Sequence, residues 1–361
     1  MKTVILIGAG SSRAEAKSQN ATKDRRPPLD TDFFPLARLH GLEPHRLKVE
    51  TFAREHFGIE TFRHPPPRME ELFGLIFSST SGSLSPPGAK DAFSSLFRIY
   101  TTVIAETTNW LTPTRKGPLC RLLHGALVDG PTTVITFNQD ILVEKALQVL
   151  TAAASPATWY PDTGYAMKFA HFTYPRGSEE TFPLSPSKQT AQPEVLKPHG
   201  SLNWYARTSV KGRVPAQLPQ TQTVFCTTRL QITTDMTTST RRPGRGRKTW
   251  YTWPIVIPPI IEKGSFLGRA LDSVWSRAWE VLLAADRVII YGYSFPEADA
   301  QGRAFFLRAS AQMPSRPLLA TINPDFGSAA KAAVIFRPRA LLHCESVRAF
   351  LKESEAFKLT S

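Results

Sequence analysis

The chain has 361 residues, 42% of them hydrophobic and 20% charged, so it is long enough and apolar enough to bury a core. This balance excludes an intrinsically disordered protein. The formal net charge of +14 and the pI near 9.9 favour the binding of anions, which include free phosphates, dinucleotides and nucleic acid.

The predicted elements begin with a short buried strand, continue through a block of helices and end in alternating strands and helices. In the first half they are strand Thr3–Ile7, helices Leu36–Phe57, Met69–Phe77, Asp91–Leu111 and Leu119–Val128, strand Thr132–Phe137 and helix Ile141–Leu150. In the second half they are strands Glu194–Lys197 and Pro254–Ile257, helix Phe266–Ala285, strand Arg287–Tyr291, helix Ala298–Arg308, strand Leu318–Ile322 and helix Val347–Phe357.

The polar segments between these elements are predicted to be loops or insertions. Residues 17–31 and 78–88 are expected to be loops, and residues 151–193 show no regular pattern. Residues 206–253 form a polar insertion, with strands expected near Thr223–Cys226 and Leu230–Thr233.

Strands that alternate with helices predict an α/β fold: a Rossmann-like, mostly parallel sheet flanked by helices, with helical and loop insertions. We expect one domain over residues 1–361, with a core of residues 1–16, 131–205 and 254–345. A helical insertion covers about 34–130, and the polar insertion covers about 206–253. The first two core strands, Thr3–Ile7 and Thr132–Phe137, should therefore lie in one sheet despite the helices between them.

The cysteines and the N-terminus predict a cytoplasmic protein without membrane contact. Cys120, Cys226 and Cys344 lie far apart, which indicates a reducing compartment and excludes a four-cysteine zinc site within one chain. The apolar run Val4–Ile7 is too short for the core of a signal peptide. No stretch approaches the roughly 20 apolar residues that span a bilayer.

Small or polar residues follow five of the predicted strands. Ligands bind beyond the carboxyl ends of the strands in open α/β sheets, so these segments should line one crevice. They are Gly8-Ala9-Gly10-Ser11-Ser12, Phe137-Asn138-Gln139-Asp140, Pro198-His199-Gly200-Ser201, Tyr291-Gly292-Tyr293-Ser294 and Asn323-Pro324-Asp325.

Each segment has a functional and a purely structural interpretation. Glycines in segment 8–12 could let free N–H groups face a pyrophosphate, or could make an ordinary turn, since the full GxGxxG spacing is absent. Asp140 suits the N-cap of the next helix, whereas Asn138 suits a ribose hydroxyl or a water. His199 could be a general base or a packed core histidine. Ser294 and Asn323 could bind ribose hydroxyls or backbone groups in turns.

In this order, GAGSS, TFNQD, KPHGSLNW, YGYSFPEAD and TINPD resemble the motifs of the sirtuin-like superfamily. HGSLNW and GYSFPEAD are more similar to its bacterial antiphage-defence branch than to the deacylases. The motifs span residues 8–325. Two features depart from the deacylase pattern: the four-cysteine zinc ribbon is missing, and the segment after the glycines is only loosely present as PPLDTDFF, where Pro28, Leu29, Asp32 and Phe33 would shape the nicotinamide end.

The resemblance implies an NAD⁺ hydrolase (NADase) that produces ADP-ribose and nicotinamide without a metal. Asn138 would position water or the ribose hydroxyls, His199 would act as the base, and Asp140 would orient its neighbours. Cleavage of this bond develops oxocarbenium character, as in glycoside hydrolysis. The residues implied to hold NAD⁺ are Gly8, Ala9, Gly10, Ser11, Ser12, Thr136, Gly200, Gly292, Ser294 and Asn323.

The resemblance further implies an antiphage-defence effector that depletes NAD⁺ when triggered. Control would come from homo-oligomerisation or from a separately encoded partner, such as a helicase-like ATPase or an Argonaute-like protein. Three alternatives stay open: a non-catalytic nucleotide-binding sensor or regulatory subunit, a protein deacylase, and a nucleic-acid-binding module. The basic segment 241–248 is either a solvated loop or a contact for nucleic acid or an acidic partner.

Overall fold

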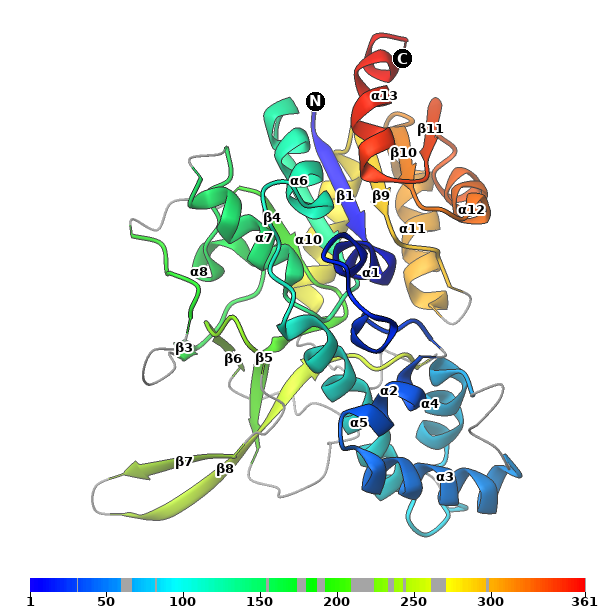
Figure 1. Ribbon diagram of the computed structural model, residues 1–361, viewed down its shortest axis with the longest axis vertical. Helices are drawn as coiled ribbons and strands as arrows, with labels where there is room; N and C mark the ends of the chain where they lie inside the picture. The colour runs from blue at the N-terminus through cyan, green and yellow to red at the C-terminus, as the bar shows by residue number, and fades with distance from the viewer. Residues whose placement is uncertain are drawn as a thin grey trace.

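A six-stranded, entirely parallel sheet forms the centre of the computed structural model (Figure 1). From one edge to the other its strands are β11 (Ala340–Cys344), β10 (Leu318–Ile322), β9 (Arg287–Tyr291), β1 (Thr3–Ile7), β2 (Thr132–Thr136) and β4 (Glu194–Leu196). The structure describes residues 1–30, 32–59, 67–81, 83–153, 156–173, 180–186, 192–208, 224–232, 237–242, 245–260, 271–296 and 299–360.

The first strand, β1, lies in the middle of this sheet. Thr3 is in register with Thr132 of β2 on one side and with Arg287 of β9 on the other. All five residues of β1 are buried, which explains its unbroken apolar, β-branched sequence, because parallel strands are covered on both faces. The prediction that Thr3–Ile7 and Thr132–Phe137 share one sheet is confirmed.

Two groups of helices flank the sheet. One group consists of α6 (Pro118–Asp129) and the helices packed against it, which are α1 (Ala9–Ser18), α7 (Leu142–Thr151) and α13 (Val347–Thr360). The other consists of α11 (Ala300–Gln312), packed against α10 (Asp272–Leu283) and α12 (Phe326–Phe336). In Figure 1, α1 lies in front of the sheet and α10 lies behind it. The Rossmann-like α/β fold class predicted from the sequence is therefore confirmed.

The helical insertion between β1 and β2 forms a bundle around the long helix α5 (Ala89–Asn109), at the lower right of Figure 1. Its other helices are α2 (Phe33–Leu39), α3 (Glu43–Phe57) and α4 (Met69–Ser78), preceded by the short 3-10 helix η1 (Lys23–Arg25). The predicted helix Leu36–Phe57 is in fact α2 and α3. Gly41, in the left-handed conformation with φ of +69°, lies between them, and Pro44 occupies the first turn of α3.

A second sheet is formed largely by segments whose sequences show no clear hydrophobic pattern of a strand. Its order is β3 (His171–Thr173), β6 (Val224–Thr227), β5 (Gly200–Thr208), β8 (Arg245–Val256) and β7 (Thr237–Arg242), and the short helix α8 (Pro161–Gly164) precedes β3. The strand expected near Thr223–Cys226 corresponds to β6, and Pro254–Ile257 overlaps the end of β8. The side chains of the basic segment 241–248 lie outside the described residues.

The strand expected at Leu230–Thr233 is wrong for its described part, residues 230–232. The backbone of Ile232 instead exchanges two hydrogen bonds, both 2.8 Å, with the side chain of Asn109. The side-chain amide of Asn109 thus makes the hydrogen bonds that a neighbouring strand would make, and it connects this segment to the end of α5.

None of the helices in the described part of the chain has the length and hydropathy that a membrane crossing needs.

Candidate functional site

A cavity of about 940 Å³ runs along the carboxyl edge of the six-stranded sheet. Its lining includes residues that follow all six strands, namely Gly8, Asn138, His199, Gly292, Asn323 and Glu345. Neighbouring strands lie ~4.8 Å apart, so the five steps from β4 to β11 give a crevice on the order of 24 Å wide. The volume is at the upper end of the range for small-molecule sites.

The glycine segment begins helix α1 directly at the end of β1. Gly8 donates its N–H to the carbonyl oxygen of Tyr291 at 3.0 Å, and Gly10 donates to that of Gly292 at 2.9 Å. A Cβ atom at Gly8 would approach the Cα of Tyr293 to 2.6 Å, so glycine is required by the close approach of the segment that follows β9. The N–H of Gly10 is therefore already committed to the backbone, and the N–H of Ser11 donates to the carbonyl oxygen of Gly8 at 2.9 Å. What the start of α1 offers an anion is chiefly the positive end of the helix dipole.

Two further glycines are required by the backbone. Gly292 has φ of +64°, and a Cβ atom there would collide with the backbone of Gly10 and Ser11. Gly200 has φ of +76°, and a Cβ atom there would collide with the carbonyl of Ile255 in β8. Gly292 lines the cavity, whereas Gly200 is not among the lining residues.

Asn138 joins the end of β2 to the glycine segment. Its side-chain nitrogen donates to the carbonyl oxygen of Gly8 at 3.1 Å and to the hydroxyl of Ser12 at 2.9 Å. Asn138 is 7% exposed and lines the cavity. Because its nitrogen is committed to these acceptors, its carboxamide oxygen is the atom left to accept a hydrogen bond from a ligand hydroxyl or a water.

Asp140 lies behind the cavity wall. One carboxylate oxygen accepts from the hydroxyl of Ser12 at 2.7 Å, and the other accepts from the backbone N–H of Leu142 at 3.0 Å. Asp140 thus connects α1 to the start of α7 in the manner of a capping residue.

The residues predicted from the sequence divide into those that line the cavity and those that support its wall. The lining group is Gly8, Ala9, Gly10, Asn138, His199, Gly292, Ser294 and Asn323. The group outside the lining is Ser11, Ser12, Thr136, Asp140 and Gly200. The hydroxyl of Ser11 donates to the carbonyl of Gly8, and that of Thr136 accepts from the N–H of Asn138, so both stabilise the strand ends.

His199 follows β4 and lies in the cavity wall, with 8% of its surface exposed. Its Nε2 atom is 3.7 Å from Oδ1 of Asp299. Its ring meets Phe137 edge to face, with ring centroids 4.8 Å apart. The imidazole is therefore held between an aromatic ring and a carboxylate.

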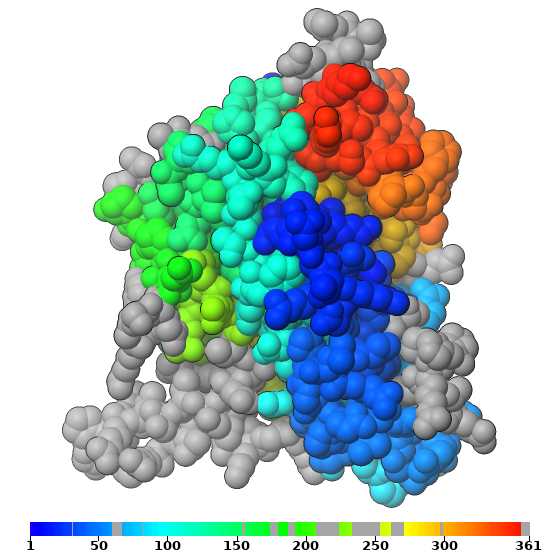
Figure 2. Space-filling view, viewed as in Figure 1, coloured from blue at the N-terminus to red at the C-terminus, as the bar shows by residue number. Residues whose placement is uncertain are grey.

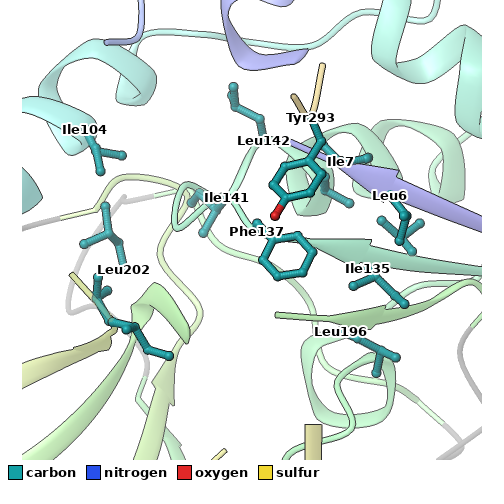
Figure 3. Packing of buried hydrophobic residues seen from close by; sticks show 14 of the residues in the cluster. Leu6, Ile7, Ile104, Ile135, Phe137, Ile141, Leu142, Leu196, Leu202 and Tyr293 are labelled. Atoms are coloured by element: carbon teal, nitrogen blue, oxygen red, sulfur yellow. The ribbon is translucent and has the colours of Figure 1, made fainter. Parts of the chain in front are cut away.

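Phe137 and Tyr293, which follow β2 and β9, stack face to face (Figure 3), with ring centroids 4.8 Å apart and an interplanar angle of 15°. The hydroxyl of Tyr293 donates to Oδ2 of Asp299 at 2.6 Å. Burial and this carboxylate raise the pKa of Tyr293 well above its ordinary value. The sequence analysis assigned no role to Phe137, Tyr293 or Asp299, although all three lie in or beside the quoted motifs.

The segment after the glycines contributes to the cavity in part. Leu29 lines it, and Asp32 accepts from Arg13 at 2.6 Å and from the N–H of Leu29 at 3.0 Å. Phe33 stacks on Tyr100, another lining residue, with centroids 5.1 Å apart. The ion pair between Arg13 and Asp32 therefore fixes this segment to α1.

Cationic side chains from α1, α13 and the start of α6 line the cavity, and Figure 2 shows these three segments (dark blue, red and cyan) side by side. They are Arg13, Lys17, Lys116, Arg121 and Arg348. The acidic lining residues are Glu70, Asp299, Asp325 and Glu345. Asp325 is occupied as the N-cap of α12, accepting from the N–H of Gly327 at 3.0 Å and from the hydroxyl of Ser328 at 3.0 Å. The cations make this side of the crevice suitable for an anionic ligand.

A buried ion pair lies beneath the two loops that carry Asn138 and His199. The ammonium of Lys197 contacts a carboxylate oxygen of Glu144 at 2.8 Å and also donates to the carbonyl oxygen of Asp140. The same carboxylate oxygen accepts from the hydroxyl of Tyr165 at 2.8 Å. Lys197 and Glu144 both have 0% side-chain exposure, so this network fixes the end of β4 to the start of α7.

Within the described part of the chain, no three His, Cys, Asp or Glu side chains are grouped so as to hold a metal ion. All three cysteines are buried as free thiols. Burial raises the pKa of Cys120 to about 12, which disfavours the thiolate that metals and electrophiles require.

No family model matches the chain, and no curated protein matches it. Among solved structures, the chain is similar to one reported for the mechanism and regulation of Sir2 enzymes, with a TM-score of 0.41 and 14% identity over 99% of this chain and 92% of that one. It is also similar to Sir2Af2 bound to a myristoylated histone peptide, with a TM-score of 0.41 and 12% identity over 100% of this chain and 93% of that one. Likeness at this level carries no information about activity, which has to be inferred from the site.

Proposed function

We propose that this chain is an NAD⁺ glycohydrolase that cleaves NAD⁺ into ADP-ribose and nicotinamide. The observation that carries the proposal is the convergence of Asn138, His199, Gly292, Ser294 and Asn323, which come from distant parts of the sequence, on one crevice. An amide and an imidazole in the same wall supply the two kinds of group that hydrolysis at a ribose carbon requires.

The dimensions and charge of the crevice support a dinucleotide as the substrate. It extends along the whole carboxyl edge of the sheet, which is the position where α/β folds of this kind bind nucleotides. The cavity that holds the N-terminus of α1 is also lined by Lys17, Lys116 and Arg121. These cations and the dipole of α1 could therefore both stabilise the pyrophosphate. If the pyrophosphate lies beside the start of α1, the nicotinamide riboside half would lie near β2 and β4. The adenosine half would then lie over β9 and β10, beside Ser294 and Asn323.

The proposed reaction breaks the bond between C1′ of the ribose and the ring nitrogen of nicotinamide. The bonding electron pair passes to the cationic ring, which leaves as neutral nicotinamide, while positive charge develops on the ribose. A water molecule attacks C1′, and His199 accepts the proton that this water loses. The side-chain oxygen of Asn138 would orient the water or a ribose hydroxyl, and Asp140 would hold the loop in place.

We further propose that the activity serves antiphage defence in the cytoplasm, where triggered loss of NAD⁺ would stop the infected cell. This part rests on the likeness of the HGSLNW and GYSFPEAD motifs to those of the defence branch. Control would then lie in homo-oligomerisation or in a separately encoded partner, a helicase-like ATPase or an Argonaute-like protein.

The test is nicotinamide release from NAD⁺ by the purified chain, alone and mixed with the products of neighbouring genes. Calorimetric titration with ADP-ribose on the same samples measures binding separately from turnover. We expect nicotinamide release in at least one assembly and its loss in His199→Ala. Tight binding of ADP-ribose without turnover in any assembly would overturn the enzyme and support the nucleotide-sensor alternative; turnover of acyl-lysine peptides would support the deacylase.

A further inference from the structure

We infer that Asp299 is the positioning residue for His199: its carboxylate fixes the imidazole in the cavity wall and stabilises the protonated ring. The inference rests on the proposed function, because it names the residue that sets the proton affinity of the proposed base. It stands on the placement of four side chains, and its first test does not depend on turnover.

The four side chains form a closed circuit. His199 contacts Phe137 edge to face, Phe137 stacks on Tyr293, Tyr293 donates to Asp299, and Asp299 faces His199 again. Each residue comes from a different segment: the ends of β2, β4 and β9, and the start of α11. All four line the cavity, so the circuit is part of the site.

The carboxylate of Asp299 is itself fixed in place. It is the N-cap of α11, where Oδ1 accepts from the backbone N–H of Gly302 at 3.1 Å. A Cβ atom at residue 302 would lie 2.5 Å from the carboxylate, so the glycine at that position permits the close approach. Tyr293 holds the other oxygen at 2.6 Å. With both oxygens held, the carboxylate cannot turn away from His199.

The chemical consequence follows from charge and burial. An imidazolium is disfavoured in a buried wall, and a carboxylate within ~4–6 Å offsets this by favouring the protonated ring. Among the described residues, the charged side chains of Glu70 and Arg303 also act on the circuit, both through Tyr293. Asp299 should therefore raise the proton affinity of His199 and make it a stronger base toward the attacking water.

If Asp299 served only as the N-cap of α11, a different result would be expected. A residue that only caps α11 would affect stability and leave the titration of His199 unchanged. Asp325 provides the matched comparison, because it caps α12 by the same type of contact and lines the same cavity, but its carboxylate is held by Gly327 and Ser328.

The experiment is an NMR pH titration of the His199 ring in the full chain, with the signal assigned by its loss in His199→Gln. In Asp299→Asn we expect the pKa of His199 to fall by about one unit, a tenfold change in proton affinity. Asp325→Asn should leave it unchanged. Tyr293→Phe keeps the aromatic stack but removes a donor to Asp299; the less dispersed charge should move the pKa of His199 upward.

The same variants are then measured in the nicotinamide-release assay. The acidic limb of the kcat/KM profile should move to lower pH in Asp299→Asn, with a lower plateau rate, because a weaker base is deprotonated earlier and accepts a proton less readily. Wild-type titration of His199 in both Asp299→Asn and Tyr293→Phe would overturn the inference. If the pKa of His199 shifts as expected in these variants but the protein does not turn over NAD⁺, the pairing of Asp299 with His199 would be supported and the proposed reaction refuted.

Discussion

The side chain of Asn138 donates a hydrogen bond of 3.1 Å to the carbonyl oxygen of Gly8, and this contact joins the ends of the two neighbouring strands β2 and β1. The residue expected to orient the water or a ribose hydroxyl therefore also holds the glycine segment in position. Its two roles use different atoms, because the nitrogen faces the backbone and the oxygen is left for a ligand. Activity and stability must accordingly be measured together for any change at this site.

Asn138→Ala and His199→Ala should each lower nicotinamide release by roughly 10²–10⁴-fold, and the double variant should be little worse than either alone, because groups that serve one step act as a unit. Asn138→Ala should also lower the melting temperature, since it breaks the contacts with Gly8 and Ser12. Rates are compared per folded molecule in the activated assembly. Equal rates for wild type and His199→Ala would refute the catalytic assignment.

Gly292→Ala should destabilise the fold by about 2 kcal/mol or more, because a Cβ atom at this positive-φ position collides with the start of α1. The matched control is Gly74→Ala in α4, where a Cβ atom meets nothing within 4 Å. That control should be neutral or gain up to ~1 kcal/mol from helix propensity. Urea unfolding of both variants measures the difference; similar stabilities would contradict the close approach of β9 to α1.

Lys197→Met should cost about 3–5 kcal/mol, because it leaves the carboxylate of Glu144 buried without its cation. Adding Glu144→Gln to this variant should restore part of the loss, since the uncompensated charge is then removed. Chemical denaturation of the single and double variants provides the measurement. A single variant within ~1 kcal/mol of wild type would contradict a stabilising role for this ion pair.

Glu15→Gln should become progressively more stable than wild type as the pH rises. Burial raises the pKa of Glu15 above its ordinary value of 4.5, so between 4.5 and the raised value the folded chain binds more protons than the unfolded one. The stability of the wild type therefore falls with rising pH across this interval and is constant above it. Melting temperatures from pH 4 to pH 8 test this; a constant difference between the two proteins would contradict it.

Much of the fold could be predicted because the central strands are short apolar runs that end in glycine or asparagine. The bounds of β1, β9 and β10 agree with the prediction to the residue. Helices α1 and α12 were missed because neither shows an apolar stripe: the first is mostly polar along its length and the second mostly apolar. Strand β11 is only partly buried at the edge of the sheet, so its sequence lacks the unbroken apolar run of a central strand.

The candidate site could be predicted only as far as strand ends identify it. The motifs named His199 and Asn138, but not the circuit around the histidine, because Phe137, Tyr293 and Asp299 meet through contacts across the sheet. For the glycines the sequence left open a phosphate-binding loop and an ordinary turn, and the close contact between the ends of β1 and β9 explains why glycine is needed there. Sequence spacing predicts which groups reach an edge of a sheet; it does not show which backbone atoms are already occupied there.

The central place of β1 also constrains how the chain can be synthesised and folded. This strand is synthesised before its two partners, which begin only at Thr132 and Arg287. Pairings between such distant residues form slowly, and an apolar strand with an open edge associates readily with other chains. Fragments that stop before Arg287 are therefore expected to aggregate, since the core becomes complete only after most of the chain has been translated.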